Sequence, residues 1–153
     1  MAQNLEISKA KIEDVDGISK LFPHWGYELT KKRVIRSFFS ENEIRFVAKI
    51  DNEIVGHILV RYNYIGDMKV AKLQSLIVAS QHRNKGIGTE VVKYALSNLK
   101  HNTKKVISQV SEKNAASLRI FKKLGFKVFC GATNQFKEKS CDEKFVTVVK
   151  DIK

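Results

Sequence analysis

The 153-residue chain is poor in the features that mark membrane, secreted and multidomain proteins. It has one proline, Pro23, and no repeat, low-complexity tract or Pro/Gly/Ser-rich linker. No apolar run approaches the roughly 20 residues that cross a bilayer, and the first residues lack the apolar centre of a signal peptide. We therefore expect one domain spanning residues 1–153, located in the cytoplasm and without a membrane partner.

Cysteine is also scarce, with only Cys130 and Cys141 in the chain. Two cysteines near the C-terminus do not make a disulfide framework, and nothing nearby has the spacing of metal ligands. We expect two free thiols and no metal site. A single cross-link between the two cysteines is the alternative.

Acidic residues are few beside basic ones: 16 Asp and Glu face 28 Lys and Arg, a formal net charge of +12. Such a field attracts polyanions, so a nucleic-acid-binding or ribosome-associated protein has to be considered. The lysines are scattered, however, and no nucleic-acid reading motif accompanies them. A nucleic-acid partner is therefore expected less than an anionic cofactor, which needs only a local part of this charge.

Hydrophobic spacing predicts a mixed α/β domain. Helices are expected over residues 12–21, 30–39, 87–99 and 114–124, with Thr30 as the N-cap of the second and Gly125 ending the last in a left-handed conformation. Strands are expected over residues 44–50, 54–61, 70–78, 105–111, 126–130 and 145–149. Loops are expected over residues 22–29, 62–69 and 131–144.

A short glycine-bearing loop, Arg83-Asn84-Lys85-Gly86-Ile87-Gly88, stands between a buried strand and an amphipathic helix. The first amides of a helix have no intrahelical partner, and the helix dipole favours anions at that end. Glycine lets the backbone approach a phosphate closely. The loop is neither the GxGxxG fingerprint nor a P-loop. It predicts a diphosphate site, the alternative being a simple tight turn.

Two motifs in this arrangement resemble the GNAT superfamily of acetyl-CoA-dependent N-acetyltransferases. The phosphate loop of that family reads Gln/Arg-x-x-Gly-x-Gly/Ala, which Arg83, Gly86 and Gly88 fit. An Asn followed by a helix ending in Leu-Gly-Phe matches Asn114 through Leu124-Gly125-Phe126. The resemblance implies an α/β fold with a strongly twisted mixed sheet of about six or seven strands, about four flanking helices and splayed central parallel strands.

The resemblance also implies acetyl-CoA as the cofactor and coenzyme A as the product. The pantetheine arm would pair with the strand that precedes the loop, the diphosphate would lie on the loop amides, and Asn114 would reach the arm or a phosphate. The alternative for Asn114 is a helix N-cap alone. The implied coenzyme-binding residues are Leu76, Ile77, Val78, Arg83, Asn84, Lys85, Gly86, Ile87, Gly88, Thr89, Asn114 and Phe121.

The implied reaction is direct attack of a primary amine, on a small molecule or a protein, on the thioester. The family often places a Tyr as general acid where this chain has Phe121, and a Glu as general base where it has Gln74. We therefore consider His57, acting through a water, and Tyr64 as candidate catalytic residues. The alternatives are a structural histidine and a surface tyrosine.

An acceptor pocket is expected around aromatic side chains of the first and second loops, namely Trp25, Tyr27 and Tyr62. The acceptor amine itself is not written in the sequence. The chain is expected to be a monomer or homodimer. Two other functions remain open at this point: an acyl-CoA-binding module with little or no catalysis, suggested by Phe121 and Gln74, and a basic nucleic-acid-associated or ribosome-associated protein.

Overall fold

The structure is a computed structural model that describes residues 4–23, 25–129 and 145–153. Cys130, Cys141 and the whole expected connection 131–144 lie outside the described residues, so the predictions made for them stay predictions. Within the described part, no helix is both long and apolar enough to cross a membrane.

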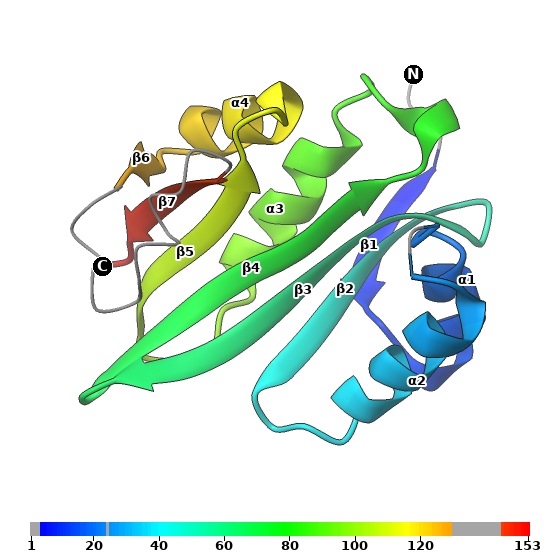
Figure 1. Ribbon diagram of the computed structural model, residues 1–153, viewed down its shortest axis with the longest axis horizontal. Helices are drawn as coiled ribbons and strands as arrows, with labels where there is room; N and C mark the ends of the chain where they lie inside the picture. Colours follow the sequence, from blue (N-terminus) through cyan, green and yellow to red (C-terminus); the bar gives the residue numbers. More distant parts are fainter. Residues whose placement is uncertain (1–3, 24, 130–144) are drawn as a thin grey trace. The chain divides into compact units, whose positions relative to one another are not determined.

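The described strands form one mixed seven-stranded sheet in the order β1-β2-β3-β4-β5-β7-β6 (Figure 1). The strands are β1 (Leu5–Lys9), β2 (Glu43–Ile50), β3 (Glu53–Ile65), β4 (Met68–Val78), β5 (Thr103–Ser111), β6 (Lys127–Val128) and β7 (Phe145–Asp151). The helices are α1 (Val15–Ser19), α2 (Tyr27–Ser37), α3 (Ile87–Ser97) and α4 (Ala115–Lys123), with 3-10 turns η1 (Ile12–Asp14) and η2 (Ser80–His82). The predicted fold class is confirmed.

The chain divides into two compact units. The first unit holds the described residues up to Arg61 together with Ser75–Asn98. The second unit holds Tyr62–Gln74 and the described residues from Leu99 onward. Strands β3 and β4 contribute residues to both units.

In the first unit, β2 is buried on both faces because its side chains alternate between two helical layers. Strands β1, β2 and β3 pair antiparallel. Phe46 points to α3, where its ring meets Tyr94 edge-on at 5.3 Å. Its neighbour Val47 points the other way and joins the hydrophobic cluster beneath α1 and α2, which lie side by side in Figure 1. This double burial explains the unbroken apolar run Phe46, Val47 and Ala48 in the middle of β2.

Helix α3 approaches β3 closely at Gly56. A Cβ placed on Gly56 would lie 3.3 Å from Ile87 Cγ2 and 3.3 Å from the Ala48 side chain. Ile87 is the first residue of α3. The missing side chain at Gly56 therefore lets the start of α3 settle directly on the sheet.

In the second unit, β4 and β5 are parallel neighbours. Their pairing runs from Lys69 opposite Thr103 to Lys72 opposite Ile107. At the next position, the Leu73 carbonyl accepts a 2.9 Å hydrogen bond from the Ser108 hydroxyl. A side chain thus supplies the partner of this carbonyl where the backbone pairing ends. On its other edge, β5 pairs antiparallel with β7, and β7 pairs with β6.

Two strand predictions need correction. The expected loop 62–69 is instead the end of β3 and the start of β4, joined by a turn at Gly66 and Asp67. The sequence of this segment resembles a polar loop because the side chains on the solvent side of the hairpin are hydrophilic. Strand β1 was not predicted, since five residues with two apolar side chains give little periodic signal. The other predicted strands exist with small shifts of their ends.

Helix α2 begins earlier than predicted. Its first residue is Tyr27, with Gly26 at the N-cap. Thr30 is therefore inside the helix rather than capping it, and its hydroxyl donates to the Gly26 carbonyl at 2.8 Å. Phe39, the last residue of the predicted helix, lies beyond the end of α2 and is 83% exposed. Gly125 does follow α4 in a left-handed conformation, with φ of 94°, as predicted.

Candidate functional site

The loop before α3 has the geometry of an anion site. Asn84 and Gly86 adopt left-handed conformations with φ of 64° and 82°, which turn the chain sharply from the strand into the helix. The first helical bond runs from the Glu90 amide to the Gly86 carbonyl at 3.1 Å. The amides of Ile87, Gly88 and Thr89 precede it and have no intrahelical acceptor. Three consecutive donors therefore lie at the positive end of α3.

The strand leading into this loop ends beside Arg83. The Ala79 amide donates to the Val55 carbonyl of β3 at 2.8 Å, while the Val78 carbonyl accepts from the Arg83 Nε at 3.1 Å. Val78 is one of the residues expected to pair with a pantetheine arm. A ligand that paired with its carbonyl would replace this guanidinium contact, and would free the Arg83 charge for a phosphate.

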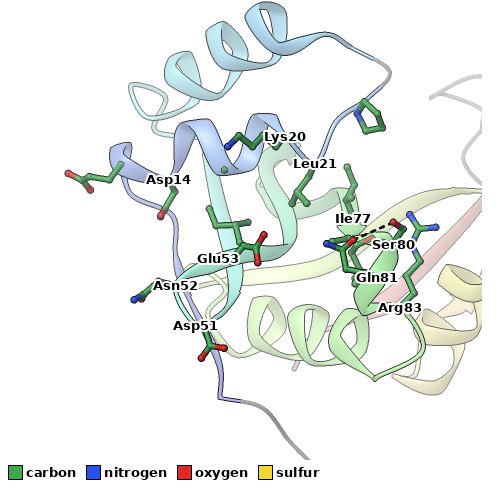
Figure 2. Close-up of a pocket in the computed structure, with 16 residues that line it drawn as sticks. Asp14, Lys20, Leu21, Asp51, Asn52, Glu53, Ile77, Ser80, Gln81 and Arg83 are labelled. Carbon is green, nitrogen blue, oxygen red and sulfur yellow. Dashed lines mark hydrogen bonds between the residues drawn. The ribbon is translucent and has the colours of Figure 1, made fainter.

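A groove of about 650 Å³ borders the same segment in the first unit. Figure 2 shows Ile77, Ser80, Gln81 and Arg83 along one end and the turn Asp51–Glu53 at the other. Acidic side chains gather at the turn and a guanidinium lies at the strand end. The Arg83 end is therefore the one suited to an anion.

Ser75 interrupts the regular conformation of β4. Its φ is +55°, a left-handed conformation that costs a non-glycine residue roughly 1–2 kcal/mol. The other described non-glycine residues with positive φ are Asp51, Asn52, Asn84 and Asn102, of the two types that tolerate this region best. Serine does not tolerate this conformation as well, so contacts with surrounding residues must stabilise the left-handed backbone of Ser75.

His57 of β3 supplies one of the holding contacts. Its side chain is fully buried, with Nδ1 2.9 Å from the Ser75 carbonyl oxygen and Nε2 2.9 Å from Arg45 Nη1. Burial, and next the Arg45 charge, lower the pKa of His57 to about 3. Burial likewise lowers the pKa of Arg45 to about 10.

This arrangement argues against the catalytic role expected for His57. Both ring nitrogens are engaged by protein groups, and the imidazole has no exposed surface. A base with a pKa near 3 is also too weak to take a proton from an ammonium at neutral pH. The geometry instead supports a structural role, the alternative stated for this residue.

The expected acceptor residues of the first unit lie at the surface. Trp25 is 40% exposed, stacks on Phe22 at 5.0 Å and lies 4.8 Å from the Arg33 guanidinium. Tyr27 is 42% exposed and donates its hydroxyl proton to Asp16. This hydrogen bond raises the pKa of Tyr27 and lowers the pKa of Asp16. Both rings are thus exposed enough to contact a ligand, and each is also fixed by contacts with neighbouring side chains.

Tyr62 and Tyr64, which the sequence placed in a loop, lie in the second-unit part of β3 and differ in exposure. Tyr62 is 3% exposed, and its hydroxyl accepts the Lys100 amide at 3.0 Å. Burial raises the pKa of Tyr62, so its place favours packing over the expected acceptor pocket. Tyr64 is 63% exposed and lies two residues before the turn at Gly66, whereas Leu76–Val78 lie at the opposite end of β4.

Asn114, Phe121 and Gln74 also belong to the second unit. Asn114 is the N-cap of α4, where its Oδ1 accepts the Ser117 amide at 3.1 Å. Phe121 is 2% exposed and packs edge-on against Phe126 at 5.0 Å. The Oε1 of Gln74 is a buried acceptor without a partner in the described structure. An acceptor of this kind suits a ligand donor but is not a base.

Sequence reasoning missed Ser37, Arg45 and Ser75. Arg45 had a usable signal, because it lies two residues before Val47 in a strand with a buried face and therefore points inward. An inward arginine requires partners, and His57 on the paired strand was the nearest polar candidate. The left-handed conformation of Ser75 had no local signal, since serine between glutamine and leucine is ordinary strand sequence.

We expect His57 to make the protein less stable as the pH falls below about 6.5. Its pKa of about 3 in the folded chain lies below the ordinary value of 6.5. Between these two values the unfolded state binds the additional proton. The free energy of unfolding should drop by about 1.4 kcal/mol per pH unit from this group alone.

Urea unfolding between about pH 6 and pH 5 isolates the effect, because carboxylates titrate mostly below that range. His57→Phe should flatten the slope by the stated amount. An unchanged slope in the variant would contradict the assignment of a neutral buried imidazole.

Comparison with known proteins agrees with this geometry. A family model described as the acetyltransferase (GNAT) family matches residues 13–126. An N-alpha-acetyltransferase of Sulfurisphaera tokodaii is 29% identical over 79% of each chain, and one of Saccharolobus solfataricus is 24% identical over 82% of this chain and 81% of its own. The PaiA N-acetyltransferase of Thermoplasma acidophilum, solved with coenzyme A, superposes with a TM-score of 0.76 at 18% identity, covering 98% of this chain and 100% of its own.

The matched segment takes in α1, α2, the strands β2 to β5, the glycine loop and α4, so the family model covers the candidate anion site as well as the fold. The chain belongs to the acetyltransferase (GNAT) family, and it is an N-acetyltransferase that transfers an acetyl group from acetyl-coenzyme A to an amine.

Proposed function

We propose that this enzyme acetylates the N-terminal α-amine of a polypeptide. The observation that carries the proposal is the weakness of the candidate bases. Gln74, which stands where the family resemblance implies a Glu, is not a base, and His57 is buried, doubly hydrogen-bonded and neutral. Attack requires an amine without its extra proton, because an alkylammonium has no free electron pair. An acceptor that loses this proton readily fits such a site best.

The α-amine is that acceptor on simple acid–base grounds. Its pKa of about 7.7–8.0 leaves roughly a quarter of it neutral near pH 7.4, whereas a lysine ε-amine with pKa near 10.4 is neutral in roughly one molecule in a thousand. The difference in reactive species is about 300-fold. An enzyme that binds the neutral α-amine needs little help from a side-chain base.

The relatives and the surface support the same acceptor. The two archaeal relatives are named N-alpha-acetyltransferases. Trp25, Tyr27 and Leu29 are all more than a third exposed around the start of α2, and such side chains suit contacts with a peptide. The net charge of +12 favours peptides that carry acidic residues. Free α-amines of newly made chains occur in the cytoplasm, the location expected from the sequence.

In the proposed mechanism the chain acts mainly through backbone groups. Amides of Ile87, Gly88 and Thr89 hold the diphosphate, and β4 from Leu76 to Val78 aligns the arm that carries the thioester. The amine attacks the thioester carbon, and a backbone N–H of β4 stabilises the negative charge that develops on the oxygen. The C–S bond then breaks, the nitrogen that has bonded to the acetyl carbon loses its proton to water, and the departing coenzyme A thiolate takes up a proton from water.

Matched peptides test the acceptor. We expect efficient acetylation of a peptide with a free α-amine and blocked lysines, and turnover at least about 100-fold lower for its partner with a blocked α-amine and one free lysine. The value of kcat/KM should rise with pH along the titration of the α-amine, near pH 7.7–8.0. Preference for the lysine peptide would overturn the proposal.

Gly86→Asp tests the phosphate loop. We expect at least about 100-fold weaker binding of coenzyme A by calorimetry, because a carboxylate would stand beside the diphosphate and oppose the 1.5–3 kcal/mol of each charged hydrogen bond. Gly66→Asp is a matched control, since Gly66 also has positive φ, 62°, and open space around it. The control should bind coenzyme A as the unaltered protein does, with a similar loss of stability. Equal binding by both variants would refute the loop assignment.

Asn114 allows its two possible roles to be separated. Its Oδ1 is used in the cap, so a role in coenzyme binding falls to the Nδ2 donor. Asn114→Asp keeps a good N-cap but removes this donor and adds negative charge. We expect unchanged thermal stability and at least about tenfold weaker coenzyme A binding, since a lost hydrogen bond to a charged group costs 1.5–3 kcal/mol. Asn114→Ala should lose both properties, whereas an Asp variant that binds normally would leave Asn114 as a cap alone.

A further inference from the structure

A buried chain of hydrogen bonds in the first unit ends on the irregular peptide of β4. It starts at the end of α2, where the Ser37 hydroxyl donates to the Val34 carbonyl at 2.6 Å. Ser37 Oγ accepts from Arg45 Nε at 2.9 Å, and Arg45 Nη1 lies 2.9 Å from His57 Nε2. His57 Nδ1 then lies 2.9 Å from the Ser75 carbonyl oxygen. Ser37, Arg45 and His57 are each at least nine-tenths buried.

The direction of every bond in this chain is fixed by Arg45. A guanidinium donates and never accepts, so His57 Nε2 must be the acceptor. The imidazole proton therefore resides on Nδ1 and is donated to Ser75. Only the neutral ring can accept at one nitrogen and donate at the other. The arginine thus selects the tautomer that holds the Ser75 carbonyl.

The hydrogen bond from His57 to the Ser75 carbonyl also sets the direction of the Leu76 N–H. The Ser75 carbonyl and the Leu76 N–H belong to one planar trans peptide group, in which C=O and N–H point in opposite directions. Holding the carbonyl toward His57 therefore directs the Leu76 N–H away from the core beneath α1 and α2. The same contact polarises the peptide and makes this N–H a stronger donor.

We propose that Ser37, Arg45 and His57 are positioning residues for acetyl transfer, which fix the left-handed Ser75 peptide and so aim the backbone N–H of Leu76 at the reacting thioester. The inference rests on the proposed course of the coenzyme arm along β4. It gives a purpose to a buried arginine that has no carboxylate within ion-pair distance in the described structure.

The first test compares His57→Phe with Val47→Ala. Val47 lies opposite His57 in the β2–β3 pairing and is fully buried in the same layer, but it has no polar side chain. We expect His57→Phe to lower kcat by about 30-fold or more, as misplacement of a reacting group does, with the Kd for coenzyme A within about threefold. Val47→Ala should lose stability and keep kcat within about threefold. Parallel losses of kcat, affinity and stability in both variants would overturn the proposal.

The second test asks whether the effect passes through the Ser75 peptide. Glycine adopts a left-handed conformation without a steric cost, so a chain carrying Ser75→Gly needs less help from His57. The fold-loss in kcat caused by His57→Phe should therefore be at least about fivefold smaller in the Ser75→Gly background. An equal loss in both backgrounds would show that His57 acts in some other way.

A milder variant keeps the proposal testable if His57→Phe does not fold. Ser37→Ala removes the acceptor of Arg45 Nε at the far end of the chain of hydrogen bonds. We expect about a fivefold loss of kcat with unchanged coenzyme A affinity, and an unchanged kcat would count against positioning. All comparisons use whichever amine the unaltered enzyme acetylates best. Failure of the α-amine preference is thereby distinguished from failure of the positioning role.

Discussion

The site depends on backbone amides that the fold leaves without partners. At the start of α3 three such amides precede the first helical hydrogen bond, and at Ser75 a left-handed residue turns a peptide of β4 out of its regular direction. Polar backbone groups are normally satisfied within a fold, so the unpaired amides at the start of α3 are suited to an anionic ligand. In the proposed mechanism the acetyltransferase needs few specialised side chains, because its main hydrogen-bond donors are backbone amides.

Because the proposed site is built from backbone groups, several of its parts could be predicted from the sequence. The phosphate loop was predictable because Gly86 must adopt a positive φ, 82°, and glycine is visible in a sequence. The helix that follows was predictable from its apolar spacing, and Asn114 from its position before α4. These features are local, so pattern and propensity suffice to find them.

The parts that were missed depend on contacts distant in sequence. His57 read as a possible base because nothing nearby showed that Arg45 and Ser75 would occupy both ring nitrogens. Tyr62 read as a pocket residue because its partner, the Lys100 amide, is 38 positions away. Strand ends were also misplaced at 62–69, where alternation of polar side chains hid a hairpin. In each case tertiary pairing decided the outcome.

The close approach at Gly56 joins the start of α3, where the proposed diphosphate site lies, to strand β3. A Cβ there would lie 3.3 Å from Ile87 Cγ2, so that Ile87, the first residue of α3, would have to shift by a few tenths of an ångström. Position 56 thus contacts the start of α3 from the sheet side, next to the amides proposed to hold the diphosphate. Substitutions at Gly56 therefore show how closely α3 must pack on the sheet for the chain to bind acetyl-coenzyme A.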